Sequence, residues 1–341
     1  MSQTTDTRSR QSTGSGWKRP AIGVLLVTAI VVPIVVGHQS VTLTDIVFYT
    51  TLWGSAATAW AVQGGLAGRL SLGHAAYFGT GAYATVVAGE QSGLSPWALL
   101  SLAVVLAVGI GVLIELVTAR LEGIYYALAT FAFAQILWLI ARGWTSVTGG
   151  TAGLSLPIPK SNFLKSGQFL EPAHYTILST LLLAITVAVY YLYGRSRRGY
   201  YVRALRDSYK AAIASGIPTL SSRASAAGIS AGLTACTGFL FATYIAFVDP
   251  DSTYSFQVST LIILPAIIGG STIFLGPTIG ALLLIPFRQW LLSTGLSELN
   301  GLDWIVYGMA LIISVLFLPE GLAVAFKRLL ARLTERIGPN R

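Results

Sequence analysis

Few residues in the apolar stretches of this sequence could do chemistry. Glu115 is essentially the one acid in the apolar stretches of the middle of the chain, and His74 is the one histidine inside such a stretch. An ionisable side chain in apolar surroundings is costly and commonly marks an ion pathway. However, Glu115 lies close to Arg120, and pairing with a nearby base or reaching the polar interface would also explain it. The acid therefore gives only weak support to an ion-coupled carrier, which is kept as an alternative interpretation of the chain.

No motif for catalysis or nucleotide hydrolysis occurs in the sequence. It contains no G-x-x-x-x-G-K-[ST] phosphate-binding loop, no H-E-x-x-H and no G-x-S-x-G. His74 by itself cannot form a metal site, and burial with a satisfied hydrogen bond is its commoner role. The single cysteine, Cys236, lies in an apolar run and is expected to pack there. We therefore predict no catalytic residue, no metal site and no cofactor.

The elements that carry these residues are long apolar segments. Of the 341 residues 54% are hydrophobic and only 10% are charged, whereas a soluble domain carries about 25% charged residues. A helix needs about 20 mostly apolar residues to cross a bilayer. We predict an all-α transmembrane bundle with about ten membrane segments, near Ala21–Val36, Ile46–Val62, Leu72–Val87, Trp97–Ala119, Ile124–Ala141, Tyr175–Tyr193, Ala224–Phe247, Val258–Ile268, Ile273–Leu291 and Trp304–Leu318.

The distribution of Lys and Arg predicts that both ends of the chain are cytoplasmic. With ten crossings, only Arg142, Lys160, Lys165 and Arg288 of the 22 basic residues lie outside, in agreement with the positive-inside rule. Ala21–Val36 lacks a clear cleavage site and is taken as an uncleaved first helix. The chain then divides into a tail of residues 1–20, a transmembrane domain of residues 21–325 and a basic tail of residues 326–341.

The segment Val258–Ile268 is the weakest of the predicted crossings. The segment is too short to cross about 30 Å of hydrocarbon as a helix, and it precedes two glycines. A broken or re-entrant helix is therefore an alternative to a full crossing. The formal net charge of +9 is explained by orientation in the membrane and contact with anionic lipid. We therefore predict the lipid bilayer as a partner and no nucleic acid.

Two polar segments between the spans are candidate interaction surfaces. The outside segment Gly143–Ala173 is either a simple connector or a surface for an extracytoplasmic partner. The cytoplasmic segment of residues 194–223 predicts an amphipathic helix over Val202–Ser215, which either lies on the membrane surface or docks into a partner. Its apolar face would carry Val202, Leu205, Tyr209, Ala212 and Ile213.

Several motifs of this chain are specific enough to suggest a family. They are Arg69–Tyr83 (RLSLGHAAYFGTGAY), Gly123–Leu137 (GIYYALATFAFAQIL), Thr148-Gly149-Gly150, Ala204–Ile217 (ALRDSYKAAIASGI), Ile268-Gly269-Gly270 with Gly276-Pro277, and Leu318–Leu322 (LPEGL). With them the chain resembles the permease subunits of ATP-binding-cassette importers for branched-chain amino acids. This group also includes urea and short-chain amide permeases. The resemblance runs from about Ile46 to Leu322.

The resemblance implies where an ATPase subunit would dock. The segment with two alanines and a glycine four residues after the second alanine is similar to the coupling helix of such importers. The residues assigned to coupling are Arg203, Arg206, Asp207, Lys210, Ala211, Ala212, Gly216 and Ile217. Lys210 departs from the family pattern, in which a glutamate often precedes the alanines.

The resemblance also implies a path and a set of partners. The residues assigned to the translocation path are Gly73, His74, Tyr77, Tyr125, Gln135, Gly149 and Gly150. The implied partners are cytoplasmic ATP-binding subunits, a second permease chain and an extracytoplasmic substrate-binding protein. The expected location is the bacterial or archaeal cytoplasmic membrane. The expected cargo is Leu, Ile or Val, with urea, an amide or another small solute as the alternative. An intramembrane enzyme has no group of residues in its favour.

Overall fold

A computed structural model describes residues 41–92, 95–156, 169 and 171–293, together with residues 305, 308, 309 and 312. The predicted span Ala21–Val36, both predicted tails and the Leu318–Leu322 motif lie outside the described residues. The same holds for most of the predicted span Trp304–Leu318 and for a large part of the segment Gly143–Ala173.

The described chain is almost entirely helical, which confirms the all-α prediction. The long helices are α2 (Val41–Ala61), α3 (His74–Ser92), α4 (Pro96–Val117), α5 (Gly123–Gly143), α8 (Pro172–Arg195), α11 (Thr219–Ile245), α13 (Phe256–Gly269) and α14 (Gly276–Ser293). The shorter elements are the π-helix η1 (Val62–Leu66), α6 (Thr145–Thr148), the 3-10 helix η2 (Gly150–Ala152), α9 (Arg197–Asp207), α10 (Tyr209–Ala214) and α12 (Pro250–Thr253). Two short antiparallel strands, β1 (Leu154–Ser155) and β2 (Phe247–Val248), join two loops.

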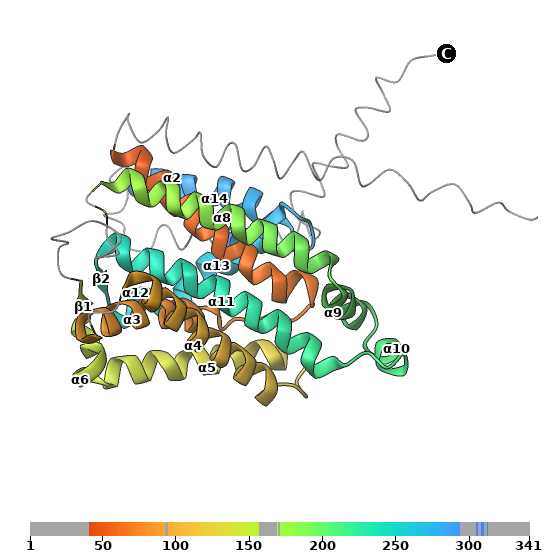
Figure 1. The fold of residues 1–341 in the computed structure, drawn as a ribbon. Helices are drawn as coiled ribbons and strands as arrows, with labels where there is room; N and C mark the ends of the chain where they lie inside the picture. The colour runs from red at the N-terminus through yellow and green to blue at the C-terminus, as the bar shows by residue number, and fades with distance from the viewer. Residues whose placement is uncertain are drawn as a thin grey trace, which may run out of the picture.

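The helices pack in two groups with α11 between them. Helix α2 packs against α8 and α14 on one side of α11, and α3 and α4 pack against its other side (Figure 1). Helices α9 and α10 lie at one end of this bundle, and β1, β2 and α12 lie at the opposite end (Figure 1). These ends are called the α9 end and the β1–β2 end below.

Small residues let α11 approach its neighbours closely. A Cβ atom at Gly238 would overlap the carbonyl of Phe78 in α3, and one at Gly81 would overlap the carbonyl of Ala235 in α11. Helices in a membrane associate through such close backbone contacts, because lipid offers no hydrophobic drive for helix pairing. Helix α11 is accordingly mostly buried, whereas α4 and α5 present most of their apolar side chains on the outside.

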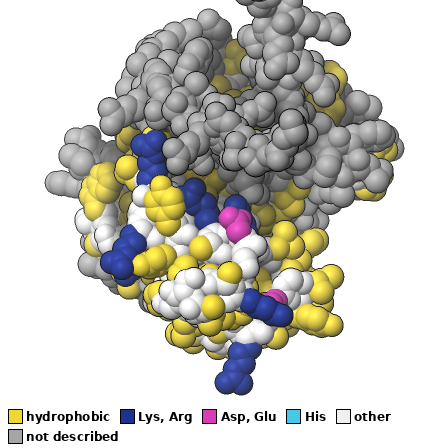
Figure 2. Space-filling model, turned by 90° about the vertical axis from the view of Figure 1, so that its right-hand side faces the viewer, with side chains coloured by type: hydrophobic (Ala, Val, Ile, Leu, Met, Phe, Trp, Pro, Cys, Tyr) yellow, Lys and Arg dark blue, Asp and Glu magenta, His cyan; other side chains and the backbone are white. Residues whose placement is uncertain are grey.

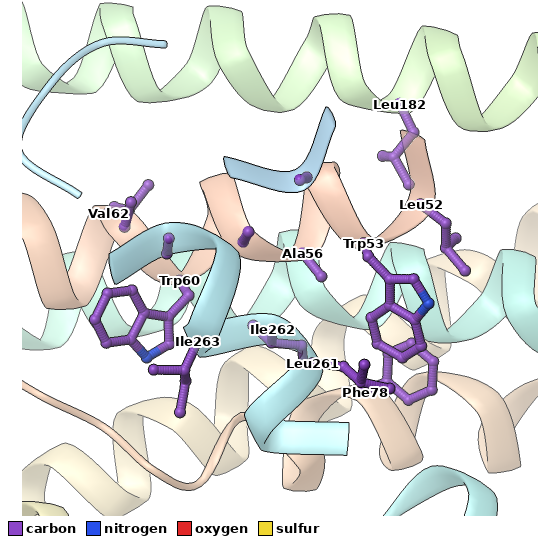
Figure 3. Packing of buried hydrophobic residues seen from close by; sticks show 14 of the residues in the cluster. Leu52, Trp53, Ala56, Trp60, Val62, Phe78, Leu182, Leu261, Ile262 and Ile263 are labelled. Carbon is purple, nitrogen blue, oxygen red and sulfur yellow. The ribbon is translucent and has the colours of Figure 1, made fainter. Parts of the chain in front are cut away.

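The main apolar core lies between α2 and α13. Trp53 of α2 stacks on Phe78 of α3 with ring centroids 5.3 Å apart, and Trp60 lies close to Ile263 of α13 (Figure 3). The buried indole of Trp60 donates its N–H to the carbonyl of Ser71 at 2.8 Å. This bond satisfies the polar edge of the ring and attaches α2 to the loop before α3.

Helices α13 and α14 run in opposite directions between the two ends. Val258 near the start of α13 lies by Arg288 near the end of α14, and the turn after α13 lies close to the α9 end. A Cβ atom at Gly280 would overlap the carbonyl of Pro265, so glycine permits the tight contact of the pair. With 14 residues, α13 is about 21 Å long, shorter than the hydrocarbon core.

Five helical segments of the described chain are long and apolar enough to cross a membrane. They are Pro96–Val117, Gly123–Gly143, Pro172–Arg195, Thr219–Ile245 and Pro250–Gly269. Each predicted span between Ile46 and Leu291 coincides with a helix, although the helices extend beyond several of the predicted limits. The number of crossings and the orientation of the ends stay predictions.

Candidate functional site

The segment predicted as one amphipathic helix consists of two helices. Helix α9 begins after Ser196, whose hydroxyl accepts a hydrogen bond from the Gly199 N–H at 3.1 Å, and it ends at Asp207. Ser208 is extended, with φ −156° and ψ 96°, and α10 starts at Tyr209. The prediction of a single helix over Val202–Ser215 was therefore wrong, because the backbone turns at Ser208.

This turn changes which side chains are buried. Val202, Leu205 and Ala212 face inward as predicted, but Ile213 is 47% exposed. Lys210 and Ala211 are exposed beside it, so α10 presents a mixed apolar and basic surface outward. Figure 2 shows this end of the molecule, where Lys and Arg side chains are spread among apolar ones with few acids between them.

Gly216 ends α10 in the conformation that only glycine adopts easily. Its φ is +75°, and it donates its N–H to Ile213 at 2.9 Å while Ile217 donates to Ala212 at 3.1 Å. This pair of bonds is a Schellman C-cap, in which a left-handed residue satisfies the last carbonyls of a helix. Gly216 and Ile217 therefore fix where the outward surface of α10 stops.

Two of the assigned coupling residues point back into the chain. Arg203 donates from Nη2 to the carbonyl of Gly194 at 2.5 Å, so it attaches α9 to the end of α8. Arg206 donates from Nη1 to the carbonyl of Gly65 in η1 at 2.9 Å. Its Nη2 also lies 2.8 Å from the exposed carboxylate of Asp207. Arg203 and Arg206 thus hold α9 on the bundle, while Lys210 and Ala211 face away from it.

The π-helix η1 is the point where α9 meets the core. A Cβ atom at Gly65 would overlap the carbonyl of Ser271, which lies in the turn between α13 and α14. The same carbonyl accepts a hydrogen bond from the Tyr190 hydroxyl at 3.0 Å. Because Arg206 binds Gly65, a displacement of α9 would act directly on η1 and on the α13–α14 turn. Single π-turns of this kind occur frequently at functional sites.

Glu115 takes part in a buried polar cluster near this end. Its carboxylate lies 2.9 Å from Nη2 of Arg69, and the two side chains are 1% and 6% exposed. Tyr126 donates its O–H to Glu115 at 2.9 Å and accepts a hydrogen bond from Nε2 of Gln63 at 2.6 Å. The Arg69 guanidinium also lies over the Tyr126 ring, 3.7 Å from its centroid.

The same arginine closes the turn between α4 and α5. Arg69 donates to the carbonyls of Leu121 at 2.6 Å and Thr118 at 3.3 Å. A buried ion pair of this geometry needs such additional bonds, because the loss of hydration otherwise exceeds the Coulombic gain. Pairing with a base is therefore the role of Glu115 here; the base comes from the loop before α3, and Arg120 is exposed.

The assigned path residues lie in three places. Gly73, His74 and Tyr77 come together at the start of α3, where a Cβ atom at Gly73 would overlap the carbonyl of Thr130. His74 is fully buried, and its Nε2 lies 2.8 Å from Oγ of Ser230. Among the described residues, its buried Nδ1 has no hydrogen-bond partner.

The remaining path residues are apart from this group. Tyr125 is 71% exposed on the outer side of α5, and Gln135 is half-buried further along the same helix. Gly149 and Gly150 both have positive φ and form the turn between α6 and η2 at the β1–β2 end. Among the described residues, no three His, Cys, Asp or Glu side chains lie close enough together to hold a metal ion.

A cavity of about 300 Å³ lies at the β1–β2 end, at the opposite end of the bundle. Five helices and the residue before α13 supply its lining: Tyr49, Trp53, Phe241, Ile245, Asp251, Ser252, Ser255, Gln257, Val258, Leu261, Arg288 and Gln289. None of these residues was singled out from the sequence as a site. A signal was present, because Arg288 is the one base inside a predicted span of the described chain, and such residues deserve a functional hypothesis.

The comparisons with known proteins agree with the motifs. The profile of the family described as "Branched-chain amino acid transport system / permease component" matches residues 42–315. The chain belongs to this family.

Two relatives of this permease are similar over most of its length. The high-affinity branched-chain amino acid transport system permease protein LivM of Salmonella typhimurium (strain LT2) is 27% identical over 322 residues. This alignment covers 87% of the present chain and 73% of the relative. The protein of the same name from Escherichia coli (strain K12) matches with the same identity and coverage. No solved structure matches the chain.

The family match covers both ends of the permease. It includes α9, α10 and the Arg69–Glu115 pair, and also every residue that lines the cavity. Both relatives are named as components of a transport system. The cavity and the α10 surface therefore both belong to the part of the chain that defines this family of transport proteins.

Proposed function

We propose that this chain is the membrane-spanning permease subunit of an ATP-binding-cassette importer for branched-chain amino acids. In this proposal a separate ATPase subunit supplies the energy, and the permease has no catalytic residue of its own. A second permease chain completes the path, and an extracytoplasmic binding protein delivers the substrate. The complex lies in the cytoplasmic membrane of a bacterium or archaeon.

The outward surface of α10 is the observation that carries this proposal. It exposes Lys210, Ala211 and Ile213 on a helix of only six residues. Such a short helix is not stable by itself, since isolated helices of this length do not form in water. Its surface is therefore suited to insertion into a groove of a partner, with a few apolar anchors and a base at the rim.

The attachment of α9 to the bundle gives this docking surface a mechanical connection. Arg206 binds Gly65, and Gly65 packs on Ser271, so α9 contacts η1 directly and is connected through it to the α13–α14 turn. Movement of a docked ATPase would therefore shift α2 relative to the α13–α14 pair. A partner drives such a change only if it binds one arrangement more tightly than the other.

The buried cluster at Glu115 supports this proposal over an ion-coupled carrier. A proton-binding carboxylate in a carrier must become accessible during the cycle, whereas Glu115 is paired with Arg69 and accepts the Tyr126 hydroxyl. Releasing it would leave a buried arginine without its counter-ion, which is strongly unfavourable. Glu115 is thus better suited to holding α4 and α5 together than to carrying protons.

Uptake by reconstituted complexes tests the proposed function. The chain is co-expressed with the genes that neighbour its own, purified and placed in liposomes together with the purified binding protein. We expect radiolabelled leucine to accumulate only when ATP is inside and the binding protein is outside. Uptake by the chain alone, driven by an ion gradient, would contradict the proposal.

Substitutions in α10 test the docking surface. Lys210→Glu restores the residue common in the family, and Lys210→Ala and Gly216→Val remove the base and the C-cap. We expect the last two variants to lower leucine uptake per ATP hydrolysed, with the thermal stability of the isolated permease little changed for Lys210→Ala. Unchanged uptake in both Lys210→Ala and Gly216→Val would eliminate α10 as the docking element.

The proposed orientation has a simple test, because Cys236 is the only cysteine. In a Cys236→Ala background, single cysteines are introduced as Ser215→Cys after α10 and Ser155→Cys in β1, both at exposed positions. With a membrane-impermeant maleimide, we expect Ser155→Cys to react in intact spheroplasts and Ser215→Cys to react only after permeabilisation. The reverse pattern would refute cytoplasmic docking by α10.

A further inference from the structure

The cavity at the β1–β2 end combines charges of both signs with an apolar wall. Arg288 of α14 and Asp251 of α12 both line it, and Trp53, Phe241 and Leu261 supply buried apolar surface. Its volume of about 300 Å³ falls at the lower end of the range of small-molecule pockets. The composition is that of a site for a small molecule that has two charged groups and one apolar group.

The two charged residues of the cavity come from different helices and are far apart in the sequence. Asp251 follows β2 at the start of α12, and its Oδ1 accepts a hydrogen bond from Nε1 of Trp138 at 2.8 Å. This bond from α5 fixes the carboxylate at the rim of the cavity. Arg288 comes from the last turns of α14, on a helix that we predict to lie in the membrane. Arg288 lies near the outside end of its predicted span, where a long basic side chain keeps its charged group in a polar or water-filled space.

The apolar wall would accept an aliphatic side chain. Trp53 and Phe241 have ring centroids 6.3 Å apart, and Val258 and Leu261 of α13 are buried beside them. Around this wall Ser252, Ser255, Gln257 and Gln289 offer hydroxyl and amide groups. A pocket of mostly apolar surface with a few polar groups fixes the orientation of its ligand through the polar groups.

We propose that this cavity binds a zwitterionic aliphatic amino acid during its passage through the permease. Arg288 binds the α-carboxylate through its planar guanidinium, Asp251 attracts the α-ammonium group, and Trp53, Phe241 and Leu261 contact the aliphatic side chain. This inference rests on the proposed function and adds the place at which the substrate binds in the membrane subunit.

The position of the cavity also connects it to the coupling end. Its walls include α2, α13 and α14, which are the elements that meet at Gly65 and Ser271 near α9. The substrate site and the α9 end therefore share the same helices.

Protection of a cysteine from modification measures binding without transport. In the Cys236→Ala background, the Gln257→Cys variant places a thiol in the exposed part of the cavity lining. The complete complex is labelled with a small maleimide in the presence of leucine, leucinamide or 4-methylpentanoate. We expect leucine to slow labelling, and the two analogues, each lacking one charge, to protect far less. The Ser215→Cys variant at the opposite end should be unaffected by leucine.

Substitution of the charges then identifies their roles. Combined with Gln257→Cys, Arg288→Gln should raise the leucine concentration that gives half-maximal protection by about ten-fold or more, because a charged hydrogen bond is lost. Asp251→Asn should have a similar effect. Arg120→Gln, which changes an exposed base at the other end, should leave protection unchanged.

The two proposals fail in distinguishable ways. If wild-type complexes take up leucine with ATP and binding protein but leucine gives no protection, the inference about the cavity is overturned and the proposed function stands. If Arg288→Gln and Asp251→Asn leave protection unchanged, the assigned contacts are overturned. Protection without any ATP-dependent uptake would retain the site and overturn the importer.

Discussion

The two ends of this bundle use opposite charges in different ways. Near the α9 end, Arg69 and Glu115 contact each other directly at 2.9 Å and are almost fully buried. At the β1–β2 end, Arg288 and Asp251 both line a cavity of about 300 Å³. The direct pair fixes parts of the chain against one another, whereas the charges at the other end lie around a cavity. Among the described residues, the α9 end therefore holds its opposite charges in direct contact, and the β1–β2 end holds them around a cavity.

The contact of Gly65 with Ser271 should be the most sensitive point of the α9 end. In Gly65→Ala the new Cβ atom would overlap a backbone carbonyl that cannot move aside cheaply. We expect a large loss of monodisperse protein in size-exclusion chromatography after membrane extraction. Gly109→Ala is the matched control, because a Cβ atom there would meet no atom of the described residues within 4 Å. Equal recovery of both variants would show that the α9 end is less tightly packed than described.

The buried and the exposed ion pair of this region should differ in their contribution to stability. Glu115→Ala leaves Arg69 buried without its counter-ion, at a cost of about 3–5 kcal/mol. Asp207→Ala removes the exposed partner of Arg206 and should cost about 0–1 kcal/mol. Thermal unfolding in detergent should therefore show a clearly lower midpoint for Glu115→Ala alone.

A double variant sharpens this result. Arg69→Met combined with Glu115→Leu removes both charges and should recover part of the lost stability. The recovery should be incomplete, since Arg69 also satisfies the carbonyls of Thr118 and Leu121. A double variant as unstable as Glu115→Ala would mean that losing the two carbonyl bonds costs as much as removing the unpaired charge recovers.

Arg206→Lys tests whether the α9 end transmits movement. Lysine keeps the charge but lacks the guanidinium that reaches Gly65. We expect leucine uptake per ATP hydrolysed to fall several-fold in the complete complex, with the basal ATPase activity preserved. Arg120→Lys, at an exposed site, should not change this ratio. The opposite order of effects would place the transmission elsewhere.

The smallest effect is expected for Gly216→Ala. Its φ of +75° costs an alanine about 1–2 kcal/mol, although the new methyl group would meet no atom within 4 Å in the described part of the chain. Because α10 is a short surface element, this cost should appear as faster hydrogen exchange of its amides and not as a lower unfolding midpoint. The α10 amides of Gly216→Asn should exchange more slowly than those of Gly216→Ala, since asparagine tolerates this conformation better. Identical exchange in all three proteins would exclude strain at this turn.

Hydropathy predicted the positions of the helices well, because long apolar runs form them. It predicted the residues at which they begin and end less well. Helix α11 was expected from Ala224 but begins at Thr219, because its first turn is polar and lies outside the apolar run. The break at Ser208 was not predicted, since the residues around it have ordinary helical spacing. Consequently Ile213 was assigned to the buried face, and the structure exposes it.

The two candidate sites also differ in how far the sequence predicted them. The coupling segment was found from a local motif, but its division into inward Arg206 and outward Lys210 depends on the position of η1. The cavity was missed because Trp53, Asp251 and Arg288 are far apart in the sequence and no spacing rule connects them. Only the unusual position of a base in an apolar stretch indicated that Arg288 required an explanation.

The sequence by itself determined that this chain is a helical membrane protein of the branched-chain amino acid permease family, because hydropathy and short motifs are local properties. The tertiary structure decided that Glu115 pairs with Arg69, that α9 is attached to the α13–α14 turn through Gly65, and that Arg288 and Asp251 line one cavity. These contacts join residues that lie far apart in the sequence. They depend on how the helices pack together, for example on the close contact that Gly65 permits with Ser271, and not on any one segment.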